Sequence, residues 1–210
     1  MTGLDGLCRA LGLGQDPQAI LRPLEALYRE IDEALAAGSA GLGLPCKPGC
    51  DACCHEAVFV SAPEVLAVGA ALFAGPREVR LRVVGEMLDV AERFEDELLL
   101  LESITPGAER DEVAARVKFR CPLLGPGGSC TVYAARELNA RTFGQSVDDV
   151  RGEPYGCALT HARLAVLQDA VPRLFSAREA RRRLAQQVPG AGFVHVYPWW
   201  FARHEAAWRA

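Results

Sequence analysis

The chain has 210 residues, half of them apolar, and a formal net charge of −4. This length suffices for one sizeable core, and the acidic balance excludes a global positive field that would attract nucleic acid or an anionic membrane. Residues 58–74 are apolar but too short to span a bilayer, and residues 1–14 lack a basic n-region and a cleavage pattern. We therefore expect a cytoplasmic protein that binds neither nucleic acid nor a membrane.

The first predicted helix begins at Asp16 and Pro17, which suit an N-cap and a first helical position. Pro23 either kinks this helix or moves its start downstream. The helix is expected to end at Gly38, and residues 38–45 form a small-residue linker. Its apolar face is made of five residues at helical spacing: Ile20, Leu24, Leu27, Ile31 and Leu35.

The middle of the chain predicts one short strand followed by three helices. Residues 57–60 are apolar and suit a strand, and Ser61 to Glu64 form a capping box that opens a helix to Phe73. A long amphipathic helix is expected over residues 77–101, and a shorter one over residues 109–117.

The last third of the chain predicts a turn followed by several helices. Residues 125–129 are rich in glycine and form the turn. Thr131 is expected to cap a helix that ends near Phe143, and a final short helix is expected over residues 198–208, whose tryptophans pack on the body. The remaining boundary signals are the N-caps Thr160 and Ser176 and a helix break at Pro172.

These elements predict a mainly α fold: a helical domain wrapped around a cysteine-rich metal site, with up to two short strands near the cysteines. We expect an N-terminal helical segment (1–45), a cysteine-rich metal-binding domain (46–160) and C-terminal helices (161–210). The three are expected to form one globular unit.

Four of the eight cysteines fall within nine residues, in the run Cys46-x3-Cys50-x2-Cys53-Cys54. In a reducing compartment such spacings favour metal ligands over disulfides. Gly49 would let the loop turn back so that its amides face the sulfurs. The adjacent Cys53 and Cys54 are expected to diverge, which argues against a mononuclear zinc site built on this run alone.

Further downstream, three cysteines and one histidine are candidate ligands of the same site. Cys121 and Cys130 flank the glycine-rich turn, so the chain reversal would bring them together. Cys157 lies in another loop, and His161, four residues later, is a weaker candidate. Cys8, on an apolar segment, is expected to be buried rather than bound.

Together these motifs resemble the zinc- or iron-chelating CxxCxxCC domain family. The resemblance covers residues 46–157 and is carried by the four-cysteine run, Cys121-Pro-Leu-Leu and Cys130-Thr-Val-Tyr-Ala-Ala-Arg136. It implies a bound zinc or iron. Glu137 stands where the family pattern has Pro, and Ala140 where it has Cys, so the site would be rearranged, keep an open position, or use His161 or another residue instead. A flagellin lysine methylase carries a related cysteine run, which implies that a modifying enzyme is conceivable.

Several alternatives stay open. The spacing from Cys46 to Cys53 also resembles the cluster loop of radical S-adenosylmethionine enzymes, although the chain lacks their alternating strands and helices. A strained Cys53–Cys54 disulfide would suit a thiol-redox role. Arg136 and Arg141 would either donate to thiolates or form helix salt bridges. The arginines at 181–183 favour a solvated helix face over an anion patch.

The sequence predicts a cysteine-rich metal-binding protein for metal handling, electron transfer or support of a partner enzyme, with a protein partner. Seven candidate thiols exceed the needs of one zinc, which favours iron, including an Fe–S cluster. The alternatives are a metal-dependent enzyme that modifies a protein or small molecule, and a structural zinc module. Whether the chain is an enzyme, and its oligomeric state, are left open, because no catalytic residues are visible. The predicted metal ligands are Cys46, Cys50, Cys53, Cys54, Cys121, Cys130 and Cys157, with His161 the weaker candidate.

Overall fold

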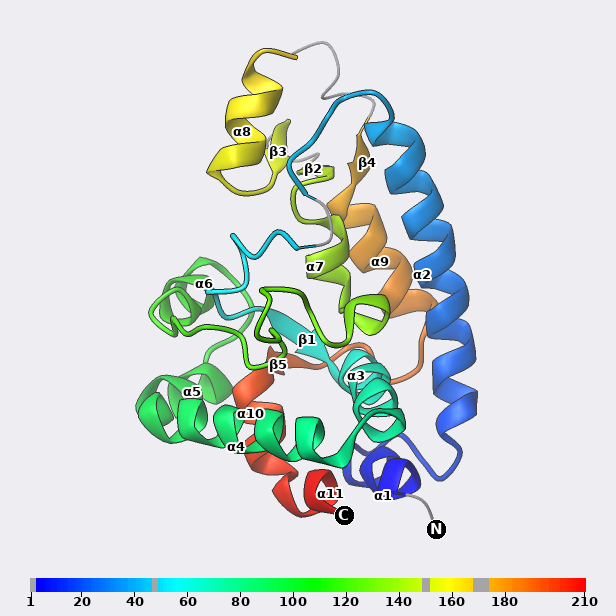
Figure 1. The fold of residues 1–210 in the computed structure, drawn as a ribbon, viewed down its shortest axis with the longest axis vertical. Helices are drawn as coiled ribbons and strands as arrows, with labels where there is room; N and C mark the ends of the chain where they lie inside the picture. The colour runs from blue at the N-terminus through cyan, green and yellow to red at the C-terminus, as the bar shows by residue number, and fades with distance from the viewer. Residues whose placement is uncertain (1–2, 47–48, 149–151, 168–173) are drawn as a thin grey trace.

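The computed structural model describes residues 3–46, 49–148, 152–167 and 174–210, and helices dominate these ranges (Figure 1). The predicted mainly α class is therefore confirmed. None of the helices in this part of the chain is both long and apolar enough to cross a membrane. The helices are α1 (Gly3–Ala10), α2 (Pro17–Ser39), α3 (Ala62–Ala74), α4 (Arg77–Arg93), α5 (Glu95–Ser103), α6 (Ala108–Ala114), η1 (Tyr133–Ala135), α7 (Leu138–Thr142), α8 (Ala158–Ala165), α9 (Ala177–Gln187), α10 (Tyr197–Arg203) and α11 (Glu205–Arg209).

Helix α2 runs along one side of the molecule and begins where the sequence predicts (Figure 1). The Asp16 carboxylate accepts a hydrogen bond from the backbone of Gln18 at 2.9 Å, which satisfies one of the free N–H groups of the first turn. Pro23 lies inside the helix and does not move its start. All five residues of the predicted apolar face are buried, and Cys8 is fully buried as expected.

Helix α3 follows β1 (Phe59–Ser61) and opens with the predicted capping box. Both the backbone N–H and the hydroxyl of Ser61 donate to Glu64 at 2.8 Å. The largest apolar cluster contains residues of all three predicted segments, from Leu7 in α1 through Leu66 in α3 to Trp208 in α11. The segments therefore share one core.

The single long helix predicted over residues 77–101 is wrong, because the chain leaves helical geometry at Phe94 (φ −118°, ψ 31°). Three acidic residues, 95–97, open α5, where the N-terminal end of the helix dipole favours negative charge. The break lets Leu98 and Leu101 pack against α6 in a second apolar cluster, separate from the core under α4.

The helix predicted from Thr131 to Phe143 is also wrong. The backbone N–H and hydroxyl of Thr131 both donate to the Leu123 carbonyl at 2.8 Å, so Thr131 closes the glycine-rich turn instead of capping a helix. A short η1 follows, and α7 starts only after Glu137, whose side chain accepts from the Ala140 backbone at 3.0 Å.

Two further boundaries differ from prediction and one is confirmed. Thr160 lies inside α8, whose N-cap is Cys157, and the C-terminal helix is interrupted at His204. Ser176 caps α9 as predicted, accepting from the Glu179 backbone at 3.0 Å. The break predicted at Pro172 lies outside the described residues.

Among the described residues, five short strands form two small sheets, where the sequence predicts at most two strands. Antiparallel β1 and β5 (Val194–Val196) pair Val60 with His195. The second sheet has the order β3-β2-β4, with β2 (Ser146–Asp148) antiparallel to β3 (Glu153–Tyr155) and parallel to β4 (Phe175–Ser176). Strands of two or three residues carry too little periodicity to predict.

Candidate functional site

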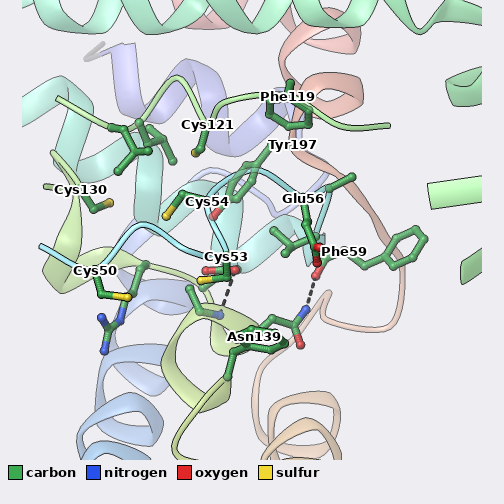
Figure 2. Close-up of a pocket in the computed structure, with 18 of the residues that line it drawn as sticks. Cys50, Cys53, Cys54, Glu56, Phe59, Phe119, Cys121, Cys130, Asn139 and Tyr197 are labelled. Carbon is green, nitrogen blue, oxygen red and sulfur yellow. Dashed lines mark hydrogen bonds between the residues drawn. The ribbon is translucent and has the colours of Figure 1, made fainter. Parts of the chain in front are cut away.

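Six of the eight cysteines line a single cavity with a volume of about 370 Å³. Five of them gather on one side of it in Figure 2, opposite Glu56, Phe59 and Phe119, with Tyr197 between. The six cysteines come from three separate stretches of the chain, so the fold brings together residues up to 84 positions apart. The six are Cys46, Cys50, Cys53, Cys54, Cys121 and Cys130.

Backbone hydrogen bonds fix the downstream cysteines against the four-cysteine run. The N–H of Cys121 donates to the Cys54 carbonyl at 2.8 Å, which joins the two stretches directly. An isolated antiparallel bridge pairs Cys130 with Leu124 across the glycine-rich turn. The chain reversal predicted at this turn is present, and Cys121 and Cys130 on either side of it both line the cavity.

The run itself is a loop of tight turns. Gly49 has φ +89°, a conformation that favours glycine, as expected for a loop that turns back on itself. The N–H of Cys54 donates to the Asp51 carbonyl at 2.9 Å. The adjacent Cys53 and Cys54 both line the cavity, and Cys54 is the main cause of the raised pKa of the Cys53 thiol.

Cys46 and Cys157 meet at a corner of the site around Thr160. The Cys46 thiol donates to the Phe143 carbonyl at 3.5 Å and interacts with the Thr160 hydroxyl, which lies 3.9 Å from the Cys157 sulfur. Cys157 is not part of the cavity wall. His161 is exposed on α8 and does not line the cavity either.

Four of the six thiols that line the cavity have a raised pKa. Burial raises the pKa of Cys46 to about 11 and that of Cys121 to about 12, and it also raises the pKa of Cys130. A hydrogen bond to Cys54, followed by burial, raises the pKa of Cys53. Because thiolates are the metal-binding form, any metal that binds here must displace these protons.

Two residues that the ligand prediction did not include stand in the cavity wall: Glu137 and Tyr197. Burial, followed by the charge of Glu64, raises the pKa of Glu137 to about 8. Burial likewise raises the pKa of Tyr197 well above its ordinary value. Glutamate is not among the preferred N-cap residues, so its position ahead of α7 carried only a weak signal in the sequence.

Of the two alternatives predicted for the candidate arginines, the salt bridge is the one found at Arg141. Arg141 is buried and binds the Asp32 carboxylate of α2 and the carbonyls of Ala134 and Arg136, so it fixes the turn before α7 instead of donating to thiolates. Arg136 lies in the cavity wall with its guanidinium 4.0 Å from the ring centre of Tyr133.

The remaining residues that the sequence singled out lie at the cavity rim, in the core or on a helix surface. His55 is half-exposed and stands 4.0 Å from the Asp51 carboxylate, and Glu56 pairs with Lys118 at 3.5 Å on the cavity rim. Trp200 and Trp208 are buried in the core, as expected for packing aromatics. Arg182 and Arg183 form ion pairs with Glu179 and Glu30, respectively, in line with a solvated helix face.

Within residues 3–46, 49–148, 152–167 and 174–210, no three Cys, His, Asp or Glu side chains stand close enough to hold a metal ion as they are arranged. The donor types nevertheless fit zinc or iron, because thiolates are soft ligands that both metals accept. No family model, no curated protein and no solved structure matches the chain.

Proposed function

We propose that this chain is a metal-binding protein whose cysteine thiolates hold zinc or iron, the latter singly or as an Fe–S cluster. Its role would be metal handling, electron transfer or support of a partner enzyme. The observation that carries the proposal is the convergence of six of the eight cysteines, from three separate stretches, on one cavity. Thiols concentrated in this way have few uses other than metal ligation in a reducing compartment.

The residues divide the work of holding the metal. Cys54, Cys121 and Cys130 stand on backbone that is already hydrogen-bonded together, so they would provide a fixed half of the site. Cys46, Cys50 and Cys53 come from the turning loop and would close on the metal. Because no three donors are preassembled, binding would draw this loop inward and release protons from the thiols.

When bound, zinc would supply a structural cross-link or Lewis acidity, and iron would supply electron transfer. All eight cysteines are free thiols, which agrees with a reducing compartment such as the cytoplasm. We include a cytoplasmic location and a protein partner in the proposal.

The test is anaerobic purification followed by metal analysis and a visible absorption spectrum. We expect stoichiometric zinc or iron in the wild-type protein and in Cys8→Ala, since Cys8 is buried in α1 and is no part of the cavity wall. The double variant Cys54→Ser, Cys121→Ser should lose the metal. A colourless protein with zinc alone would remove iron from the proposal. A wild-type protein that holds neither metal would refute the proposal.

One observation favours a second candidate, a metal-dependent enzyme that modifies a protein or small molecule. The cavity is larger than a metal ion requires, and the apolar residues Val58, Phe59 and Phe119 form part of its wall. Its volume falls in the range of about 300–1,000 Å³ typical of small-molecule sites. This candidate predicts an exchangeable coordination position, so azide should change the spectrum of the Co²⁺-substituted protein. A closed structural site would leave that spectrum unchanged.

A further inference from the structure

Glu137 is a carboxylate in the wall of the cavity that the cysteines line. It is 3% exposed, stands between η1 and α7, and lines the same cavity as the six cysteines. Its Oε1 accepts a hydrogen bond from the Ala140 backbone at 3.0 Å, which fixes the direction of the side chain. The carboxylate is therefore oriented before any metal arrives.

Thiols from both halves of the site share the cavity wall with this carboxylate. Its charge acts on Cys53 from the loop and on Cys121 and Cys130 from the fixed half. Once the thiols ionise, several negative charges would face one another in a buried space. Among the described residues no lysine or arginine forms an ion pair with Glu137, although Arg136 lies near it. A divalent cation would supply the missing positive charge.

Two other carboxylates show what sets Glu137 apart. Glu64 is also buried, but it is outside the cavity wall and accepts four hydrogen bonds, from two groups of Ser61, from Tyr28 and from Leu138. Glu56 lines the cavity, but it is largely exposed and pairs with Lys118. Only Glu137 of these three combines burial, a place in the wall and the lack of a paired cation.

We propose that the Glu137 carboxylate is an oxygen ligand of the bound metal, so that the site is a mixed thiolate–carboxylate centre. This inference depends on the proposed metal-binding function. Like the fixed half of the site, Glu137 lies outside the turning loop, and it would bind through the oxygen that does not accept from Ala140. Zinc and iron both accept carboxylate oxygen beside sulfur.

The first experiment is a competition titration of Zn²⁺ into the metal-free protein, with E137Q compared with E56Q. The amide of E137Q keeps an oxygen for the Ala140 N–H, so the metal-free variant should melt within about 3 °C of wild type. Its Zn²⁺ affinity should fall at least about tenfold, because losing even an outer partner of a metal site costs about 10–100-fold. E56Q removes a carboxylate from the same cavity and should leave the affinity unchanged.

The second experiment is X-ray absorption at the zinc or iron edge of the metal-loaded wild-type protein, which does not depend on any variant folding. We expect an oxygen at about 2.0–2.2 Å besides sulfur at about 2.3 Å. A first shell of sulfur alone would overturn the inference, and so would an E137Q protein with wild-type affinity. Both results leave the metal-binding proposal standing, whereas a wild-type protein that takes up no metal would refute that proposal itself.

Discussion

Two buried carboxylates, Glu64 and Glu137, mark two differently constructed regions of this molecule. In the core around α3, Glu64 is 3% exposed and accepts hydrogen bonds from α2, from β1 and from the first residue of α7. In the cavity wall, Glu137 is equally buried. The side chains that share the cavity with it include six cysteine thiols. The first carboxylate is satisfied by the protein, and the second faces groups that repel it when charged.

The difference teaches how the fold separates scaffold from chemistry. Where the chain needs only to hold its shape, its polar groups pair with one another, as Arg141 does with Asp32 and two carbonyls. Around the cavity the backbone is paired, as Cys121 is with Cys54, while Glu137 in the wall forms no ion pair among the described residues. A bound cation would balance the charge of Glu137 in the cavity, as hydrogen-bond donors already satisfy Glu64 in the core.

The largest expected effect is in the core. Glu64→Ala leaves the N–H groups of Ser61 and Leu138 and the Tyr28 hydroxyl buried without their acceptor. Each such loss costs about 1–3 kcal/mol, so we expect a total loss of about 4 kcal/mol, measured by urea denaturation of the metal-free protein. A loss below about 1 kcal/mol would mean that Glu64 does not join the three elements as described.

The second expected effect is a pH dependence of stability that arises from a buried histidine. His195 on β5 is fully buried between Arg110 of α6 and Glu102 of α5, and burial, followed by the charge of Arg110, lowers its pKa from 6.5 to about 4. The folded state therefore binds fewer protons than the unfolded state in this range. The contribution of His195 to the free energy of unfolding is therefore fully present above pH 6.5 and is lost as the pH drops towards 4.

We expect this single group to remove about 3 kcal/mol over that interval, since one pKa unit corresponds to about 1.4 kcal/mol. The measurement is the free energy of unfolding from pH 7 to 4 for wild type and His195→Asn, whose amide oxygen can still accept from Val196. The two proteins should differ in slope below pH 6.5. Equal slopes would show that His195 titrates normally.

The helical class and the main caps could be predicted because their signals are local. Asp16, Ser61 and Ser176 cap helices with side chains a few residues from the groups that they bond. The break before α7 could not be predicted, because its cause is distant. Arg141 takes the carbonyls of Ala134 and Arg136 while it binds Asp32, which stands 109 positions earlier.

For the site, spacing alone grouped the cysteines that line the cavity, since clustered thiols are rare and have few uses. Their ligation of a metal remains a prediction. Glu137 could not be identified as part of the wall from sequence, because an isolated glutamate is usually exposed and only the fold buries this one. The Thr160 corner was equally hidden, because Cys46 and Cys157 meet there over more than 100 residues.

The smallest of the three effects tests how tightly the cavity region is packed. Gly144 has φ +84°, and a Cβ added there would stand 2.0 Å from the Cys46 sulfur and 3.1 Å from the Thr160 hydroxyl. Gly144→Ala should therefore cost about 2 kcal/mol in the metal-free protein, part of it from the left-handed backbone, and displace Cys46. Gly127→Ala is the matched control, because no atom lies within 4 Å of its added Cβ.

If Cys46 is a ligand, Gly144→Ala should also weaken Zn²⁺ binding, while Gly127→Ala should leave both stability and affinity close to wild type. Lost stability with unchanged affinity would mean that Cys46 serves only the packing of the Thr160 corner. In that case the site would rest on the five remaining cysteines of the cavity and on Glu137, and the corner would belong with the core as scaffold.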